Sequence, residues 1–206
     1  MNEQEMFWTN SFGDRYRQNN EKFDDDLQVK AWGKMLNSIM HDKPNTILEC
    51  GSNIGRNLMT LKRLLPSVKV SLIEINKESF NLAVKNVSPE HSFNGTILQS
   101  DFKNNSFDLT YTSGVLIHIP PYDLYKNMAK IYNYSDKYIL IAEYFARDME
   151  SKIYHGQINK LFKMDFGGFF MDNFSVNIVD YGFLWGREYD AGGFDDITWW
   201  LFKKKN

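Results

Sequence analysis

Residues 47–57 read Ile47-Leu-Glu-Cys-Gly-Ser-Asn-Ile-Gly-Arg-Asn57, and this stretch decides the fold. It opens as an apolar strand that contains one acid, Glu49, and Gly51 follows the strand directly. Glycine tolerates the positive φ angle of a tight turn, and Gly55 lets the next helix pack closely. A buried strand, a glycine turn and a helix in this order are typical of a nucleotide-binding α/β unit.

Short apolar runs alternate with amphipathic stretches after this unit, which predicts a largely parallel sheet covered by helices. The strands are expected at residues 46–50, 68–75, 96–99, 107–112 and 137–143. Helices are expected at 3–10, 25–41, 54–65, 77–86 and 160–171, and another begins at Pro120 and Pro121 and carries Leu124, Met128 and Ile131. Residues 175–185 and 196–204 read as an antiparallel hairpin with a wide connection.

The composition limits the class of protein. The chain has 206 residues and a formal net charge of −2, so we expect one domain, with a helical cap or lid at 1–44 and a sheet core at 45–206. The charge favours neither nucleic acid nor an anionic membrane as a partner. One cysteine, Cys50, permits neither an internal disulfide nor a zinc module. The start has no apolar leader pattern, and we expect a cytoplasmic protein.

The glycine spacing after Glu49 bears on the ligand. A dinucleotide site favours G-x-G-x-x-G, but Asn53 stands where the middle glycine usually falls. An acid at the strand end suits a cationic group, such as an ammonium or sulfonium, better than a phosphate. A helix-capping role for Glu49 is the structural alternative.

Three further segments carry polar residues at expected strand ends. Glu74 ends the second strand, where a carboxylate can accept hydrogen bonds from both ribose hydroxyls. Asp101 and Phe102 follow the third, where an acid can meet an adenine amine and an aromatic ring can cover the base, although Asp is also a common turn former. Thr112–Gly114 closes the fourth strand and leads to His118.

These four segments resemble the motifs of class I S-adenosylmethionine-dependent methyltransferases. The resemblance implies a Rossmann-like seven-stranded sheet of order 3-2-1-4-5-7-6 with an antiparallel seventh strand, S-adenosyl-L-methionine as cofactor and S-adenosyl-L-homocysteine as product. The residues that it places around the cofactor are Glu49, Gly51, Ser52, Asn53, Gly55, Glu74, Ile75, Asp101, Phe102, Thr112, Ser113 and Gly114.

A narrower resemblance covers nearly the whole chain. It is carried by Glu5-Met-Phe-Trp8, Gly114-Val-Leu-Ile-His118, Tyr138-Ile-Leu-Ile-Ala-Glu-Tyr144, Leu161-Phe-Lys-Met-Asp-Phe166 and Asp196-Ile-Thr-Trp-Trp200, and it is to the methylases associated with pseudaminic acid biosynthesis. It implies a sugar or amino-sugar acceptor of the nonulosonic-acid type. The chain departs from that family's pattern at Asn19 and around 154–160, which are expected acceptor-side positions.

Methyl transfer needs alignment of the acceptor and removal of one proton. His118 is the leading candidate for the base, and packing at a helix entry is its alternative role. Glu143, Tyr144 and Asp165 are secondary candidates for the acceptor pocket. The alternative for Glu143 is ordinary polarity at a strand end, and the alternative for Asp165 is a position on a solvated helix face. Aromatic residues, 16% of the chain, concentrate toward its two ends, and we expect Trp8, Tyr16 and His155 in a lid or acceptor wall.

Other functions are weighed against this one. Asp24–Asp26 and Asp195–Asp196 lack the strand-end setting of a metal site, so no metal is expected. An NAD-type Rossmann oxidoreductase would share Glu74 but not the glycine spacing, and a catalytically silent cofactor-binding module would need no base. The expected partner is a small-molecule substrate, and the expected assembly is a monomer or homodimer.

Overall fold

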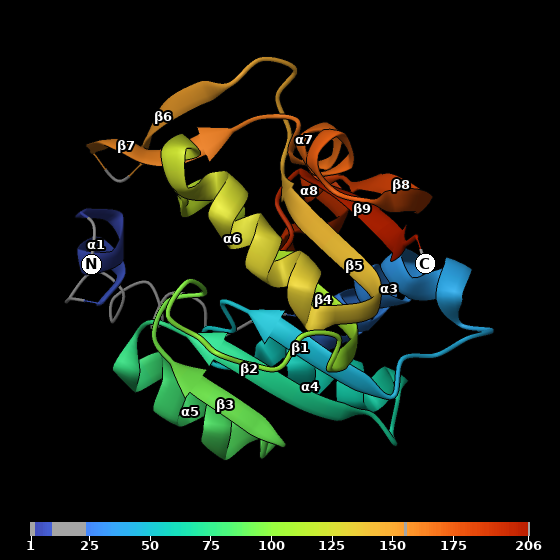
Figure 1. The fold of residues 1–206 in the computed structure, drawn as a ribbon. Coiled ribbons are helices and arrows are strands. Elements are labelled where there is room, and N and C mark those ends of the chain that lie inside the picture. Colours follow the sequence, from blue (N-terminus) through green and yellow to red (C-terminus); the bar gives the residue numbers. More distant parts are fainter. Residues whose placement is uncertain (1–2, 10–23, 155, 206) are drawn as a thin grey trace.

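The computed structural model describes residues 3–9, 24–154 and 156–205, and its centre is a seven-stranded, mostly parallel sheet (Figure 1). The spatial order is β3-β2-β1-β4-β5-β9-β8. The strands are β1 (Thr46–Cys50), β2 (Lys69–Glu74), β3 (His91–Asn94), β4 (Phe107–Ser113), β5 (Ser135–Tyr144), β8 (Val176–Leu184) and β9 (Ile197–Lys204).

Counted within this sheet alone, β8 and β9 are the sixth and seventh strands, which gives the predicted order. β9 pairs antiparallel with both β5 and β8, so the predicted hairpin is confirmed. The numbering along the chain differs because a separate two-stranded hairpin, β6 (Glu150–Tyr154) and β7 (Gln157–Lys163), follows β5. This hairpin was not predicted from the sequence.

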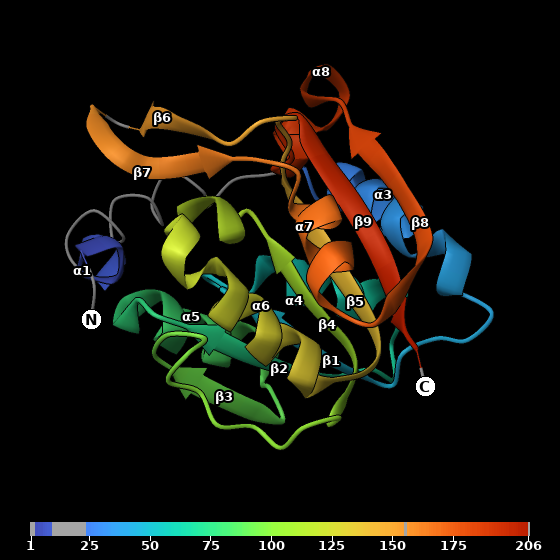
Figure 2. The same ribbon diagram turned by 45° about the horizontal axis from the view of Figure 1, so that its top comes forward.

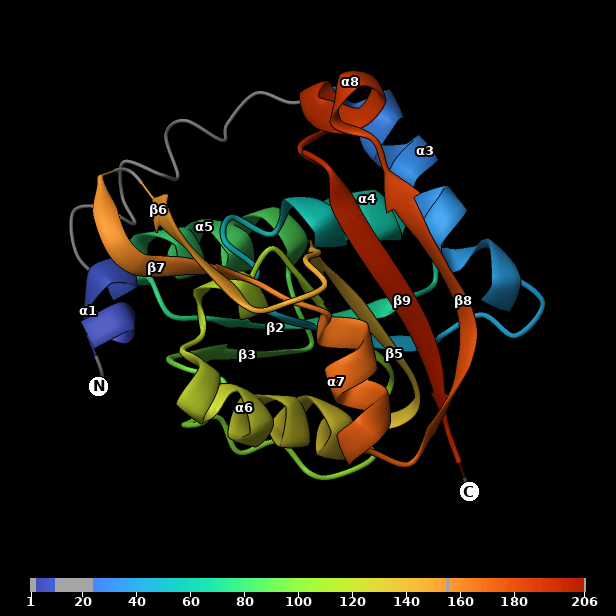
Figure 3. The ribbon, with the colours of Figure 1, turned by 90° about the horizontal axis from the view of Figure 1, so that it is seen from above.

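Helices cover both faces of the sheet, as Figure 3 shows. One face carries α3 (Asp25–Leu36), α4 (Arg56–Leu64) and α5 (Lys77–Val87), and the other carries α6 (Pro121–Tyr134) and α7 (Phe166–Asn173). Trp199 packs in the first core and Trp200 in the second, because adjacent strand residues point to opposite faces. Short segments complete the fold: η1 (Asn37–Ile39), η2 (Leu116–His118), α8 (Gly186–Tyr189) and η3 (Asp190–Gly192).

Two predicted elements were wrong. Residues 96–99 form a turn rather than the third strand, because Thr96 N–H donates to Gln99 Oε1 and Gln99 N–H donates to Thr96 Oγ1, both at 3.1 Å. Residues 160–171 are not one helix. The chain leaves β7 at Lys163, and α7 begins only at Phe166, after its N-cap Asp165.

The N-terminal region divides into two parts. α3 belongs to the core, since Ala31, Trp32 and Met35 are fully buried against the sheet. α1 (Glu3–Thr9) instead lies beside the β6–β7 hairpin (Figures 1 and 2), and the rings of Trp8 and Tyr154 are 6.4 Å apart. None of the helices in the described ranges combines the length and apolar character needed to cross a bilayer.

Candidate functional site

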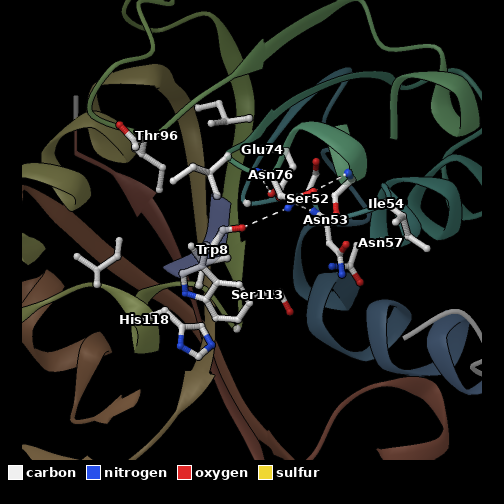
Figure 4. Close-up of a pocket in the computed structure, with 18 of the residues that line it drawn as sticks. Trp8, Ser52, Asn53, Ile54, Asn57, Glu74, Asn76, Thr96, Ser113 and His118 are labelled. Carbon is white, nitrogen blue, oxygen red and sulfur yellow. Dashed lines mark hydrogen bonds between the residues drawn. The ribbon is translucent and has the colours of Figure 1, made fainter. Parts of the chain in front are cut away.

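A cavity of about 260 Å³ opens at the carboxyl ends of β1 to β4 (Figure 4). Much of its wall comes from the carboxyl ends of these strands and the residues that follow them, which are 51–54, 74–76, 95–97 and 113–115. In open α/β sheets this edge is where ligands bind, at the point where the strand order reverses. The sequence and the topology therefore place the candidate site at the same edge.

The turn after β1 requires its glycine. Gly51 has φ +86°, and a Cβ there would lie 2.5 Å from Val115 Cγ2. The N–H groups of Gly51 and Ser52 donate to Ile73 O, which fixes the turn against β2. Gly55 does not line the cavity. It packs against Val87 of α5, which confirms the predicted close helix packing.

Glu49 lies beneath this turn and does not line the cavity. Its Oε1 accepts a hydrogen bond from Asn57 Nδ2 at 2.8 Å, and Trp32 Nε1 donates to Asn57 Oδ1. Burial raises the pKa of Glu49 to about 8, so the carboxyl is largely protonated at neutral pH. Asn57, which does line the cavity, connects the Glu49 carboxyl to the cavity wall.

Glu74 lines the cavity and is held by backbone donors. Asn53 N–H donates to Oε2 and Asn76 N–H donates to Oε1, each at 2.7 Å. Burial raises the pKa of Glu74, and these N–H groups oppose that shift. A carboxylate oxygen has the capacity for more than one hydrogen bond, so the two Glu74 oxygens can also accept from two ligand hydroxyls. Ile75 lines the same wall.

The structure does not bring Asp101 and Phe102 to the cavity. Asp101 is exposed, and the Phe102 ring packs edge-on against Phe107 and Tyr134. Gly95, Thr96 and Ile97 take this wall instead, because the third strand ends at Asn94 rather than at residue 99. The predicted adenine contacts rested on the misplaced strand, and Gly95 was the signal in the sequence that could have corrected it.

The β4 end supplies Ser113 and Gly114, and Gly114 has φ +66°. Thr112 is fully buried below them and does not line the cavity. The following turn carries η2, whose last residue is His118.

His118 lines the cavity beside Trp8, away from Glu74 (Figure 4). Its Nδ1 lies 2.8 Å from Lys160 O, and because a carbonyl only accepts, Nδ1 carries the hydrogen and Nε2 keeps a lone pair. Burial lowers the pKa of His118 to about 4, so the ring is neutral near pH 7. The rings of Trp8 and Tyr154 lie 4.5 Å and 5.2 Å from the imidazole.

The secondary candidates for catalysis lie away from the cavity. Glu143 is fully buried and accepts hydrogen bonds from the turn after β4. The Tyr144 ring lies under the Lys163 ammonium, and Asp165 caps α7 by accepting from Gly168 N–H at 2.8 Å. Tyr16 and His155 lie outside the described residues.

Several polar side chains at the cavity were missed from the sequence, and Gln28 and Arg56 are two of them. Gln28 lies in α3, is buried, and accepts a hydrogen bond from Thr60 through Oε1. Arg56 opens α4 and pairs with Asp25 at 3.3 Å. Gln28 shares the buried face of α3 with Ala31 and Met35, and an amide in that apolar pattern was the available signal.

Sequence comparison matches residues 47–136 to a family model described as a methyltransferase domain. That segment holds Gly51, Glu74 and His118, which line the cavity, so the predicted enzyme class is confirmed for this segment. No curated protein matches the chain by sequence.

Solved structures of methyltransferases share the fold. Magnesium protoporphyrin IX methyltransferase from Synechocystis PCC 6803, solved with bound S-adenosylmethionine, superposes with a TM-score of 0.72 at 12% identity over 100% of this chain and 99% of that one. The 1,6-didemethyltoxoflavin-N1-methyltransferase of Burkholderia thailandensis, solved with S-adenosylhomocysteine, superposes with a TM-score of 0.68 at 14% identity, over 89% of this chain and 80% of that one. The N-methyltransferase NodS of Bradyrhizobium japonicum WM9 superposes with a TM-score of 0.65 at 13% identity, over 89% of this chain and 99% of that one.

Proposed function

We propose that this chain is a cytoplasmic S-adenosylmethionine-dependent methyltransferase whose acceptor is a sugar or amino-sugar intermediate of the nonulosonic-acid type. The observation that carries the proposal is a single cavity with the Glu74 carboxylate on one wall and the neutral His118 imidazole on another. The first suits a ribose, and the second suits a proton-releasing acceptor.

The residues present fit the cofactor. Glu74 is oriented for two ribose hydroxyls, Thr96 and Ile97 offer a wall for adenine, and the missing Cβ of Gly51 makes room for Val115, which lines the cavity. Gln28 and Asn57 lie where the polar methionine end would bind. When bound, S-adenosylmethionine supplies an electrophilic methyl group on a sulfonium.

The chain's own residues then align the acceptor and receive its proton. His118 Nε2 has a lone pair that can take the proton of an acceptor hydroxyl as its oxygen attacks the methyl carbon. For an acceptor ammonium, Nε2 takes a proton first, which frees the nitrogen lone pair for the attack. Alignment of the two reactants in a closed site supplies most of the acceleration for such a displacement. Trp8 closes this end of the site from α1, where its carbonyl accepts from Asn76 Nδ2 at 3.3 Å.

The sugar assignment is supported by the resemblance to the pseudaminic-acid-associated methylases and by the walls around His118. Trp8 lines the cavity with an aromatic ring there, Tyr154 packs behind it against the His118 imidazole, and a sugar offers one apolar face with a rim of hydroxyls. Trp8→Ala is therefore expected to raise the KM for the sugar acceptor more than it lowers kcat.

The cofactor assignment is tested by calorimetric titration of S-adenosylhomocysteine. Wild-type protein is expected to bind it, and Glu74→Ala is expected to weaken binding by roughly tenfold or more, since two hydroxyl partners are lost. Glu78→Ala, an exposed acid on α5, is the matched control. Equal affinity in wild type and Glu74→Ala contradicts the ribose assignment, and tighter binding of NAD favours the oxidoreductase.

The reaction is tested by mass spectrometry of nine-carbon sugars and amino sugars incubated with S-adenosylmethionine. A methylated product is expected, and His118→Ala is expected to lower turnover by roughly 100-fold or more with cofactor affinity retained. His41→Ala, an exposed histidine, is the control. Cofactor binding without turnover across these acceptors would identify a catalytically silent module.

A further inference from the structure

We propose that Glu143 is a positioning residue: its carboxylate holds the turn that carries His118 and so fixes the imidazole at the cavity. The proposal rests on the proposed function for the role of His118, but the geometry of the turn is independent of it. Glu143 lies near the end of β5 and has no exposed surface.

The carboxylate binds three consecutive backbone donors. Oε1 accepts from Val115 N–H and Leu116 N–H, both at 3.1 Å, and Oε2 accepts from Ile117 N–H at 3.3 Å. Successive N–H groups of a short helical turn form a concave site for an anion or a carboxyl group. These donors belong to the start of η2, and His118 is the residue that follows them.

The same turn forms part of the cofactor side of the cavity. Val115 lines the cavity and fills the space above Gly51, and Gly114 N–H donates to Ala142 O on the strand that carries Glu143. A shift of this turn would therefore move a wall of the cavity and the base together. β5 supplies the rigid element from which both are held.

The contacts on the imidazole itself do not replace this anchor. Lys160 O fixes one ring nitrogen, and the Trp8 and Tyr154 rings pack beside the imidazole, but all three partners come from elements outside the sheet. The three bonds to Glu143 connect the His118 backbone to the central sheet. These three hydrogen bonds hold the His118 backbone at the position from which the Nδ1 atom of its ring reaches Lys160 O.

Glu143→Gln separates positioning from simple packing. Glutamine has nearly the same size, but its amide nitrogen is a donor and cannot accept from Ile117 N–H. The readout is the ¹⁵N and ¹³C imidazole NMR spectrum of His118, which reports the tautomer and the titration, with His41 and His91 as internal references. Glu49→Gln, an equally buried carboxyl on β1 without contact to this turn, is the matched control.

In wild type we expect His118 in the Nδ1–H tautomer and without titration between pH 5.5 and 8. In Glu143→Gln we expect mixed tautomers and a titration midpoint that lies within pH 5.5–8, whereas Glu49→Gln behaves as wild type. If Glu143→Gln unfolds, Glu143→Asp, which keeps the acceptor oxygens at shorter reach, is measured in the same way.

An unchanged His118 spectrum in a folded Glu143 variant overturns the proposal. The proposed function fails separately, by absence of S-adenosylhomocysteine binding to wild type. Activity with an accepted sugar adds a double-mutant cycle, in which Glu143→Gln has little further effect once His118→Ala is present. Additive losses in that cycle would show that Glu143 does not act through His118.

Discussion

Gly51 combines two constraints that exclude any side chain. Its φ of +86° is a left-handed conformation that costs an L-residue about 1–2 kcal/mol. Val115 Cγ2 also occupies the space where a Cβ on this residue would lie. Gly51→Ala is therefore expected to destabilise the protein by at least that amount and to lower S-adenosylhomocysteine affinity, because Val115 must move. Thermal unfolding and calorimetric titration measure the two effects.

The matched control for this change is Gly33 of α3, where an added Cβ meets nothing within 4 Å. Gly33→Ala is expected to raise the free energy of unfolding by about 0.5–1 kcal/mol, because alanine favours a helix interior. An affinity for S-adenosylhomocysteine in Gly51→Ala equal to that of wild type would show that the turn does not shape the site.

At the scale of elements, Asp165 has a structural role as the N-cap of α7, and its catalytic role stays a prediction. It accepts a hydrogen bond from Gly168 N–H as the N-cap of α7. Asp165→Ala is expected to lower the free energy of unfolding by about 1 kcal/mol and to leave cofactor affinity unchanged. Asp165→Asn, which keeps an acceptor oxygen, is expected to recover most of the loss in denaturant unfolding. If Asp165→Asn recovers the stability of wild type but still loses turnover, a catalytic role for Asp165 would be supported.

The elements that sequence patterns predicted well are those with strong periodicity. α6 buries Leu124, Met128 and Ile131, and β1 continues directly into its glycine turn. β3 was missed because His-Ser-Phe-Asn at 91–94 is short, polar and without alternation, whereas the apolar run beside it is bound into a turn by Thr96 and Gln99.

The candidate site was predicted where its residues follow a strand directly. Glu74, Ser113 and Gly114 line the cavity for that reason. Glu143 also stands near a strand end, but its carboxylate turns to backbone donors of the neighbouring segment rather than to the cavity. Only the three-dimensional path of residues 114–118 distinguishes these cases.

At the scale of the whole molecule, buried carboxyl and imidazole groups couple stability to pH, and Glu74, whose pKa burial also raises, acts in the same direction as Glu49 and Glu143. Burial raises the pKa of Glu49 to about 8 and of Glu143 to about 7, and lowers that of His118 to about 4. The unfolded chain releases the carboxyl protons near pH 4.5 and binds a histidine proton near pH 6.5. The carboxyl groups make stability fall as the pH rises, and below pH 6.5 the histidine makes it rise, so the two contributions oppose each other. Above pH 6.5 the histidine is neutral in both states, and the carboxyl contribution remains.

Between pH 6.5 and 8 the folded state retains carboxyl protons that the unfolded state has lost, so stability is expected to fall as the pH rises. Glu49 alone accounts for about 2 kcal/mol over this range, at 1.36 kcal/mol per pH unit. Glu49→Gln keeps an acceptor for Asn57 Nδ2 but cannot ionise, so its denaturant-unfolding free energy is expected to depend less on pH than that of wild type. Glu90→Gln, an exposed acid paired with Lys69, is the control and is expected to keep the wild-type slope. The same slope in Glu49→Gln and wild type would mean that the Glu49 carboxyl beneath the Gly51 turn is ionised in the folded protein, and Asn57 would then be held by a carboxylate.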